Sequence, residues 1–162
     1  MGYSSSLMQI YRLTRKKYSD KLSGKGAAIK GARWNSIGTE MIYCAENRSL
    51  AMAEVAVHYS LAMLPDDYVM LTIQCDDTLK VKEIPLDELP AKWNVFPPLK
   101  GTQEIGDHFI REGKFALCRI PSVVTPGDYN LLVNPHHKGF EKIKIVKVEP
   151  FVFDNRLFAP EQ

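Results

Sequence analysis

Glu54 is the one carboxylate in an otherwise apolar run, LAMAEVAVHYSLAML, which covers residues 50–64. At helical spacing the apolar residues of this run form one stripe with Glu54 on its flank, and the stripe consists of Leu50, Ala53, Val57, Leu61 and Leu64. An ionised carboxylate is costly to remove from water unless it is hydrogen-bonded or paired with a cation. A lone glutamate on a buried helix therefore indicates either a catalytic or binding site or an internal ion pair with a neighbouring arginine.

Before this run in the sequence, Arg33 and Tyr43 have side chains suited to a planar, charged ligand. Arg33 follows two small residues in the segment GARWN, and its guanidinium suits the bidentate binding of a phosphate. A surface arginine beside a turn is the alternative interpretation. Tyr43 lies in the apolar segment MIYC and is either a core ring with a satisfied hydroxyl or a platform for a planar ligand.

The segment 121–137 gathers neutral hydrogen-bonding side chains around short apolar stretches. They are Ser122, Asn130, Asn134, His136 and His137. Such groups are suited to binding ribose hydroxyls or a carboxamide. Ser122 has a second interpretation, because a serine at this place can also cap a turn.

Several common catalytic patterns are absent from the sequence. Ser122 lies in no GxSxG elbow, and no HExxH zinc helix occurs. Glu54 and His58 at i, i+4 are too sparse for a metal site, so no metal is expected. The glycines at 24, 26 and 31 form neither a P-loop nor a GxGxxG pattern. A nucleotide, if bound, must be held in another way.

Length and charge favour a single domain without a nucleic-acid footprint. The 162 residues are 45% hydrophobic, which is enough for one core without cross-links. Lys and Arg total 21 against 19 Asp and Glu, a formal charge of +2, so we expect no direct binding to nucleic acid. One domain is expected over residues 8–158, with residues 1–7 as a flexible leader and 159–162 as a tail.

The cysteines and the N-terminus predict a soluble, cytoplasmic protein. Cys44, Cys75 and Cys118 are odd in number and widely spaced, which favours a reducing compartment and argues against structural zinc. The N-terminal residues lack the basic and apolar regions of a signal peptide. No apolar run approaches the roughly 20 residues of a membrane span, so no contact with a membrane is expected.

Short strands dominate the predicted elements. Strands are expected at 8–13, 41–45, 68–75, 79–84, 115–120, 129–133 and 143–153, with a further strand beginning at 33–35. Asn47 or Ser49 caps the helix that carries Glu54, and a second helix spans 102–112 and ends at Gly113. Residues 23–26 predict a mobile surface loop, and 86–99 an irregular, proline-rich segment. This pattern favours an α+β domain with a largely antiparallel or split sheet.

With these elements placed, the order of the motifs resembles the RES-domain toxins of bacterial type II toxin–antitoxin systems. The matching motifs are Tyr11-Arg12, Gly31-Ala32-Arg33-Trp34-Asn35, Gly38-Thr39, Ile42-Tyr43, Ala53-Glu54-Val55, Val57-His58, Pro121-Ser122, Asn130-Leu131-Leu132-Val133-Asn134-Pro135, His137 and Asp154-Asn155-Arg156-Leu157-Phe158. The resemblance extends from residue 8 to residue 158. No motif covers the residues before Met8 or the stretch 92–100.

The resemblance implies an ADP-ribosyltransferase-like fold with a few flanking helices, and NAD as a substrate rather than a cofactor. Cleavage of the nicotinamide–ribose bond passes through an oxocarbenium-like cation, which a carboxylate stabilises. That role falls to Glu54. The remaining roles are pyrophosphate binding by Arg33, stacking on nicotinamide by Tyr43, hydrogen bonding on the nicotinamide side by Ser122, and phosphate binding or pocket shaping by Arg12 and Asn134.

The family also implies a partner, an antitoxin with a helix-turn-helix region through which the pair contacts DNA. The toxin would degrade NAD and arrest growth, as a glycohydrolase or a phosphorylase. Two alternatives stay open. In the first, the chain is a protein-directed ADP-ribosyltransferase. In the second, it is a catalytically silent domain that only binds its antitoxin.

Overall fold

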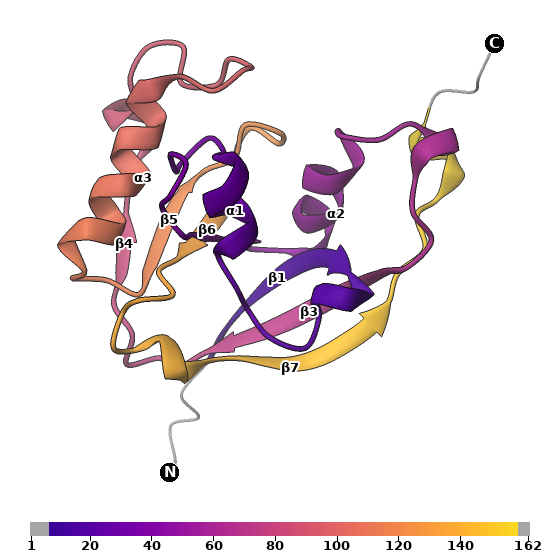
Figure 1. Cartoon of the computed structure of the whole chain (residues 1–162), viewed down its shortest axis with the longest axis horizontal. Helices are drawn as coiled ribbons and strands as arrows, with labels where there is room; N and C mark the ends of the chain where they lie inside the picture. The colour runs from indigo at the N-terminus through magenta and orange to yellow at the C-terminus, as the bar shows by residue number, and fades with distance from the viewer. Residues whose placement is uncertain (1–6, 159–162) are drawn as a thin grey trace.

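The computed structural model describes residues 7–158 and, for Leu61, the backbone only. Apart from Leu7, which is exposed, the predicted leader lies outside the described residues, as does the predicted tail at 159–162. Figure 1 shows a sheet flanked by a few short helices. No helix within residues 7–158 is long and apolar enough to cross a membrane.

Within residues 7–158, seven strands form one mixed sheet. They are β1 (Met8–Arg15), β2 (Ile42–Ala45), β3 (Tyr68–Cys75), β4 (Val81–Glu83), β5 (Leu117–Pro121), β6 (Tyr129–Val133) and β7 (Ile143–Pro150). Their order in the sheet is β4-β5-β6-β2-β1-β3-β7. The β4–β5 pair is parallel, and each of the other pairs is antiparallel. The predicted α+β class with a largely antiparallel sheet is therefore confirmed.

In the described part of the chain, three α-helices and five short 3-10 helices accompany the strands. The helices are α1 (Lys25–Lys30), α2 (Arg48–Ala56) and α3 (Lys100–Glu112). The 3-10 helices are η1 (Lys16–Tyr18), η2 (Leu61–Met63), η3 (Leu86–Glu88), η4 (Phe140–Lys142) and η5 (Asn155–Leu157). In Figure 1, α2 lies over β1 and α3 lies beside β4 and β5.

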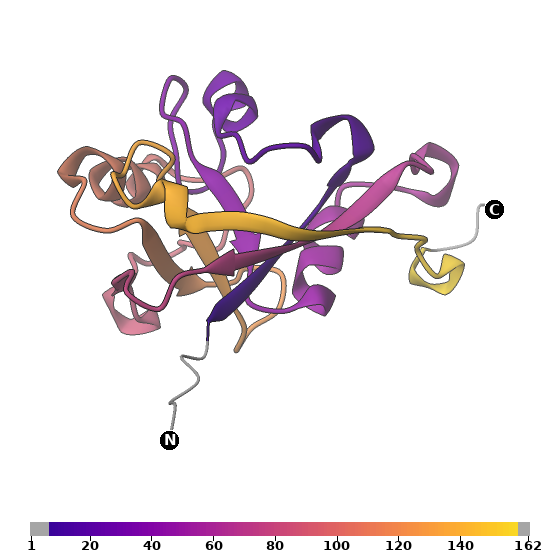
Figure 2. The same cartoon turned by 90° about the horizontal axis from the view of Figure 1, so that it is seen from below.

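The sheet nearly divides in two between β1 and β2. Those strands share one registered pair, Tyr11 with Ala45, whereas β1 and β3 stay paired from Met8–Cys75 to Arg15–Tyr68. Figure 1 shows β1, β3 and β7 grouped below α2, and Figure 2 shows the same group from below. Side chains of both strands can therefore point into the space where β1 and β2 separate.

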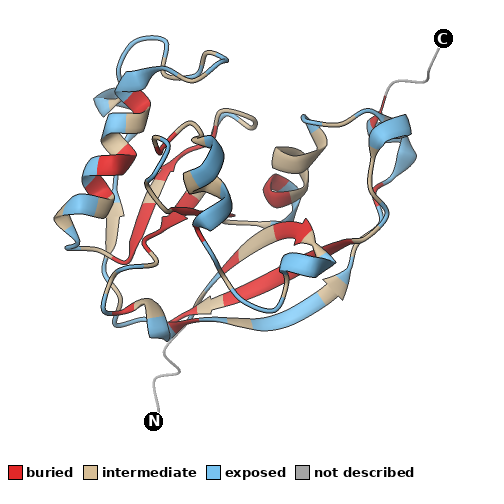
Figure 3. Ribbon diagram, viewed as in Figure 1, coloured by how far each residue is buried: buried red, intermediate tan, exposed pale blue. Residues whose placement is uncertain are grey.

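Apolar side chains bury both faces of the central strands. Ile10 and Ile73 pack on one face. On the other face, Leu13 and Met70 pack in one cluster with Leu50 of α2. A third cluster lies beneath α3 and contains Trp34, Met41, Ile84, Phe109, Cys118, Ile120 and Leu132. Figure 3 shows these strands buried and the edge strand β7 largely exposed. The core thus forms a rigid frame around the β1–β2 division.

The helix that carries Glu54 is shorter than the sequence predicted. Asn47 caps α2 as expected, since its side chain accepts a hydrogen bond from the Leu50 amide at 2.7 Å. The helix ends at Ala56, and Val57 is 61% exposed, so the predicted apolar stripe through residue 64 is wrong. Tyr59 instead packs beside Tyr68, whose hydroxyl donates to that of Tyr59 at 3.0 Å. This packing overrides the helical spacing.

Two further expectations near the N-terminus are corrected. The predicted mobile loop at 23–26 instead leads into α1, and a Cβ at Gly24 would lie 2.6 Å from the Met41 amide nitrogen. The predicted strand onset at 33–35 is a turn closed by a single bridge between Ala32 and Asn35. Gly24 therefore allows close packing against the chain that enters β2, rather than mobility.

Candidate functional site

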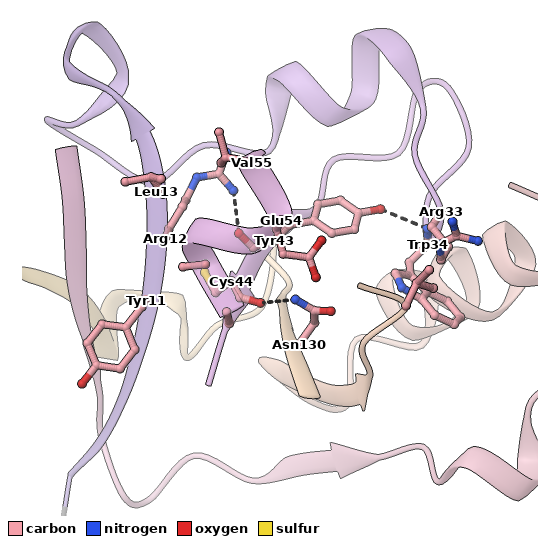
Figure 4. A pocket seen from close by; sticks show the side chains of 13 residues that line it. Tyr11, Arg12, Leu13, Arg33, Trp34, Tyr43, Cys44, Glu54, Val55 and Asn130 are labelled. Atoms are coloured by element: carbon pink, nitrogen blue, oxygen red, sulfur yellow. Dashed lines mark hydrogen bonds between the residues drawn. The ribbon is translucent and has the colours of Figure 1, made fainter. Parts of the chain in front are cut away.

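A pocket of about 260 Å³ opens where β1 and β2 separate. It is lined by residues from β1, β2, α2, β6 and the turn after α1. They are Tyr11, Arg12, Leu13, Arg33, Trp34, Tyr43, Cys44, Ala45, Ala51, Glu54, Val55, Val123 and Asn130. Figure 4 shows Glu54 between Arg12 and Arg33 in this view. The structure thus brings together four of the six predicted site residues.

Arg12 spans the division of the sheet. Its Nη1 donates a hydrogen bond of 2.7 Å to the carbonyl oxygen of Tyr43, on the neighbouring strand. The strands have already separated at this point, so the arginine side chain supplies a link that the backbone ladder lacks. The remaining N–H groups of Arg12 stay available to a ligand in the pocket.

Arg33 is held by two carbonyls from the irregular segment before α3. Its Nη1 donates to the carbonyl oxygens of Trp93 at 2.9 Å and Val95 at 2.8 Å. Burial lowers the pKa of Arg33, and the charge of Glu54 acts in the opposite direction. An arginine nevertheless keeps its charge at any physiological pH.

Within residues 7–158, neither Arg12 nor Arg33 forms a salt bridge. Their acceptors are neutral carbonyl groups, so no carboxylate neutralises either guanidinium at close range. Two such cations in one pocket favour an anionic ligand, and a pyrophosphate matches their planar donor groups.

Glu54 is partly buried and bonded to neutral groups. Its Oε1 accepts a hydrogen bond of 3.3 Å from Ser122 Oγ. Burial raises the pKa of Glu54 above the ordinary glutamate value, and the polar side chains of Asn130 and Ser122 oppose that shift, with smaller effects from His58 and Arg33. No salt bridge to Glu54 occurs among the described residues, so an internal ion pair is not the reason for its burial.

Ser122 caps a turn and contacts Glu54 at the same time. Its buried Oγ accepts hydrogen bonds from the amides of Val124 and Thr125, both at 3.1 Å, and donates to the glutamate. The two interpretations of Ser122 are thus combined in one side chain. Ser122 lies beside the pocket that Glu54 lines, on the wall of an adjoining cavity of about 300 Å³.

Asn35 organises the turn that carries Arg33. It is fully buried, and its Nδ2 donates to the carbonyls of Ala27, Ser36 and Thr39. Its Oδ1 accepts a hydrogen bond of 2.6 Å from the hydroxyl of Tyr43. The same hydroxyl accepts a bond of 3.1 Å from the Trp34 amide, and burial raises the pKa of Tyr43. The tyrosine hydroxyl is therefore satisfied while the ring forms part of the pocket wall.

Helix α3 fixes the same turn from its outer side. Asp107 accepts hydrogen bonds from the Ser36 amide at 3.0 Å and the Ser36 hydroxyl at 2.5 Å. Gly106 lies against the backbone of Trp34, where a Cβ would fall 1.6 Å from the carbonyl oxygen. Any larger residue at 106 would displace the helix from the turn. The position of Arg33 thus depends on α3 as well as on its own segment.

The structure places Asn134 and Asn130 in different surroundings. Asn134 is buried beyond the end of β6, where it donates to the Ile110 carbonyl at 3.5 Å and accepts from the His136 amide at 2.9 Å. It does not line the pocket. Asn130 does, and it donates to the Cys44 carbonyl at 3.2 Å. Four residues along a strand span about 13 Å, which separates the two amides.

Asn130 lines the pocket, although the sequence analysis named it only within a group of hydrogen-bonding side chains and not among the individual site residues. The antiparallel register pairs Pro121 with Tyr129, so Asn130 lies at the same end of the hairpin as Ser122. Pairing the two predicted strands in this register would have identified it. The pairing of β5 with β6 was not derivable from the residue pattern alone.

The pocket contains one thiol and no metal cluster. Burial raises the pKa of Cys44 to about 12, so the group stays protonated at neutral pH and is a poor nucleophile. Within residues 7–158 no group of three His, Cys, Asp or Glu side chains is placed to hold a metal ion. The arrangement suits an anionic ligand with a charge-stabilising carboxylate beside it.

The nearly divided sheet, the two arginines and the partly buried glutamate lie within residues 9–154, and these residues match the RES domain family. The chain therefore belongs to the RES domain family, as the sequence resemblance predicted. Over 152 residues it is 37% identical to a protein of Photorhabdus laumondii named Toxin Res, covering 93% of this chain and 97% of the relative.

A second relative and a solved structure extend this comparison. A Sphingobium protein named Prs ADP-ribosylating toxin is 33% identical over 156 residues, covering 95% of this chain and 97% of the relative. The crystal structure of the M. tuberculosis MbcT-MbcA toxin-antitoxin complex contains a similar chain, with a TM-score of 0.69 and 22% identity. That match covers 90% of this chain and 84% of the other, and it supports the fold alone.

Proposed function

We propose that this chain is the toxin of a toxin–antitoxin pair and that it breaks the bond between nicotinamide and ribose in NAD. The carrying observation is the pocket at the β1–β2 division, in which Arg12 and Arg33 are bonded to carbonyls and Glu54 to neutral side chains. The names of the relatives, two toxins with 37% and 33% identity, support this function.

In this proposal the two arginines bind the pyrophosphate of NAD. Arg33 supplies the main clamp, because its planar donor groups match paired phosphate oxygens, and Arg12 binds from the opposite strand. Tyr43 stacks on the nicotinamide ring with a hydroxyl already fixed by Asn35. Asn134 would act only indirectly, by holding the end of β6 against α3.

Glu54 stabilises the charge that develops as the bond breaks. The leaving of neutral nicotinamide places positive charge on the ribose, and an ionised carboxylate nearby lowers the energy of that state. Its hydrogen bond from Ser122 orients the carboxylate without neutralising it, so no rearrangement is needed when the charge appears. Ser122 also faces the nicotinamide side of the ligand in this proposal.

A second candidate function is ADP-ribosylation of a protein. The observation that favours it is the 33% identical relative named Prs ADP-ribosylating toxin, which matches nearly the whole chain. The two functions share the first step and differ in the acceptor, which is water or phosphate in one and a protein side chain in the other. An ADP-ribosyltransferase-like fold is part of both proposals.

The test is to incubate the purified chain, freed of any antitoxin, with NAD in buffers with and without phosphate. Nicotinamide release without phosphate identifies a glycohydrolase, and release that requires phosphate identifies a phosphorylase. Release that requires added lysate, with ADP-ribose transferred to a protein band, identifies a transferase. Glu54→Gln is the matched control, and its release is expected to fall by a factor on the order of 10²–10³. No release under any condition would contradict the catalytic proposal and support a silent, antitoxin-binding domain.

An antitoxin partner belongs to the same proposal. The solved relative is a toxin-antitoxin complex, and its fold is shared by this chain. We expect an antitoxin with a helix-turn-helix region that covers the pocket, so that the pair contacts DNA through the antitoxin, and we expect the pair in the cytoplasm. Adding that antitoxin to the nicotinamide assay should suppress release. Unchanged release in the presence of a bound antitoxin would contradict occlusion of the pocket.

A further inference from the structure

The segment between η3 and α3, residues 89–99, contains the two carbonyl groups that hold Arg33. Both hydrogen bonds of its Nη1 go to this segment, at Trp93 and Val95. The segment has no motif of the family resemblance, and two of its backbone bonds are turn contacts, from Trp93 to Pro90 and from Val95 to Lys92, both at 3.2 Å. A turn alone leaves the carbonyls free to move, so another contact must fix them.

Trp93 supplies that contact. Its half-buried ring stacks on Trp34, with ring centroids 6.2 Å apart and planes at 28°. Trp34 is the neighbour of Arg33 in the chain and is itself 3% exposed. The side chain of Trp93 thus binds residue 34 while its carbonyl binds residue 33. The two contacts fix the segment to the turn at adjacent positions.

We infer that Trp93 is a positioning residue for Arg33, and that it orients the guanidinium toward the pyrophosphate of NAD by anchoring the segment that holds Nη1. The inference rests on the proposed function. Because the acceptors are carbonyls, Arg33 is fixed without losing its charge to a carboxylate. A donor group held in one orientation before binding loses less freedom when the ligand arrives. Trp93 therefore raises NAD affinity through Arg33 without touching the ribose or the reacting bond.

A direct contact between Trp93 and the ligand is the competing explanation. Trp93 also lines the adjoining cavity of about 300 Å³, together with Ser122 and Val123, and Val123 lines both cavities. A ring in that wall could touch the ligand itself. The two explanations differ in whether the effect of Trp93 on NAD depends on Arg33.

A double-mutant cycle separates the two explanations. NAD dissociation constants are measured for Trp93→Ala, Arg33→Ala and the double variant, all in a Glu54→Gln background that leaves NAD intact. Trp93→Ala alone is expected to weaken binding about tenfold, the size of one charged hydrogen bond. In the Arg33→Ala background its effect should fall to within about twofold, the scatter of independent sites. Trp93→Phe, which keeps a stacking ring, should restore most of the affinity.

Leu89→Ala is the matched control. Leu89 packs half-buried in the same cluster and the same segment, and the carbonyls that accept hydrogen bonds from Arg33 belong to Trp93 and Val95 instead. It should lower the melting temperature without changing NAD affinity. Two outcomes would overturn the positioning role. One is an equal loss of about tenfold from Trp93→Ala with and without Arg33→Ala. The other is unchanged NAD affinity in a folded Trp93→Ala variant.

Nitrogen-15 NMR of the arginine side chains tests the positioning without NAD. The Arg33 signals are assigned by their loss in Arg33→Ala. Two carbonyl acceptors restrict rotation of the guanidinium, so separate Nη signals are expected in the wild type and in Leu89→Ala, and averaged signals in Trp93→Ala. Unaveraged signals in Trp93→Ala would overturn the inference. A wild type that binds no NAD would contradict the proposed function, while this comparison would still decide the role of Trp93.

Discussion

Two glutamates of the same β2–α2 unit have opposite surroundings. Glu46, just after β2, is bonded through Oε2 to Arg119 Nη2 at 3.1 Å and through Oε1 to the Tyr129 amide at 3.0 Å. Arg119 lies over the Tyr129 ring at 3.7 Å and reaches Glu83 at 3.5 Å. Glu54, on α2, is bonded to neutral donors.

The difference shows where the molecule uses its charges for folding and where it leaves them available. Burial is the largest single influence on the pKa of Arg119 and lowers it, but the hydrogen bonds and charges of Glu46 and Glu83 together outweigh burial, so the pKa is raised overall. The pKa of Arg33, bonded to carbonyls, is lowered by burial. Glu46 and Arg119 neutralise each other as an ion pair. The pocket instead holds two cations and one carboxylate in place without pairing them. Only the second arrangement retains charges for a ligand.

The largest expected effect follows from Glu54→Gln. Nicotinamide release should fall by a factor on the order of 10²–10³, the usual loss when one charge-stabilising group is removed. Because the folded state raises the pKa of Glu54, wild-type stability is reduced as pH rises through the ordinary glutamate range. The melting temperature of Glu54→Gln at pH 7 should therefore equal or exceed that of the wild type. A variant that unfolds, or that consumes NAD at the wild-type rate, would contradict the distinction between the two glutamates.

The next effect in size is expected from Arg33→Ala. The NAD dissociation constant, measured in the Glu54→Gln background, should rise about 10- to 100-fold, because one charged bidentate contact is lost. Arg15→Ala is the matched control, since Arg15 forms a half-exposed surface pair with Asp67 at 2.8 Å. It should leave NAD affinity unchanged and alter the melting temperature little, because solvent screens an exposed ion pair. An equal loss of affinity in both variants would mean that overall charge, rather than the pocket, attracts NAD.

A smaller effect is expected from Asn130→Ala. Asn130 lines the pocket with Glu54, and its polar amide opposes the burial-raised pKa of that carboxyl group. Its removal should raise that pKa further, so the acid limb of the activity profile should move to higher pH. Activity on the alkaline plateau should fall roughly fivefold, about 1 kcal/mol. The measurement is nicotinamide release as a function of pH.

Asn134→Ala decides between the two asparagines. Its side chain lies away from the pocket, so it should lower the melting temperature and leave the acid limb in place. If the acid limb of the pH profile moved in Asn134→Ala but not in Asn130→Ala, Asn134 rather than Asn130 would be the residue that acts on Glu54. The role that the sequence suggested for Asn134 would then be direct.

The parts of the fold with a local signal were predictable from the sequence. The segment Tyr68–Cys75 is rich in apolar and β-branched residues between polar turns, and the strand in the structure has the same bounds. The end of α3 at Gly113, with φ of 62°, follows from the freedom of glycine in the left-handed region. The partial burial of Glu54 beside a pocket also followed from one charge in an apolar run.

The remaining features depend on contacts distant in sequence. Arg33 was predictable as a candidate, but its acceptors are backbone carbonyls 60 and 62 residues away, and a carbonyl has no residue type that could reveal it. The end of α2 is set by the packing of Tyr59 with Tyr68. The spacing of apolar residues along the helix does not reveal this contact. Asn130 required the β5–β6 register before it could be chosen over Asn134.

The smallest effect on catalysis is expected from Glu46→Gln, and it tests the other half of the comparison. The variant keeps an oxygen for the Tyr129 amide but removes the charge that pairs with Arg119. Because Arg119 is about one third exposed, water screens part of the loss, and the free energy of unfolding should fall by about 1 kcal/mol. Chemical denaturation measures this, and nicotinamide release should match the wild type. A loss of activity at unchanged stability would instead assign Glu46 to the site, and the two glutamates would no longer divide into one for folding and one for chemistry.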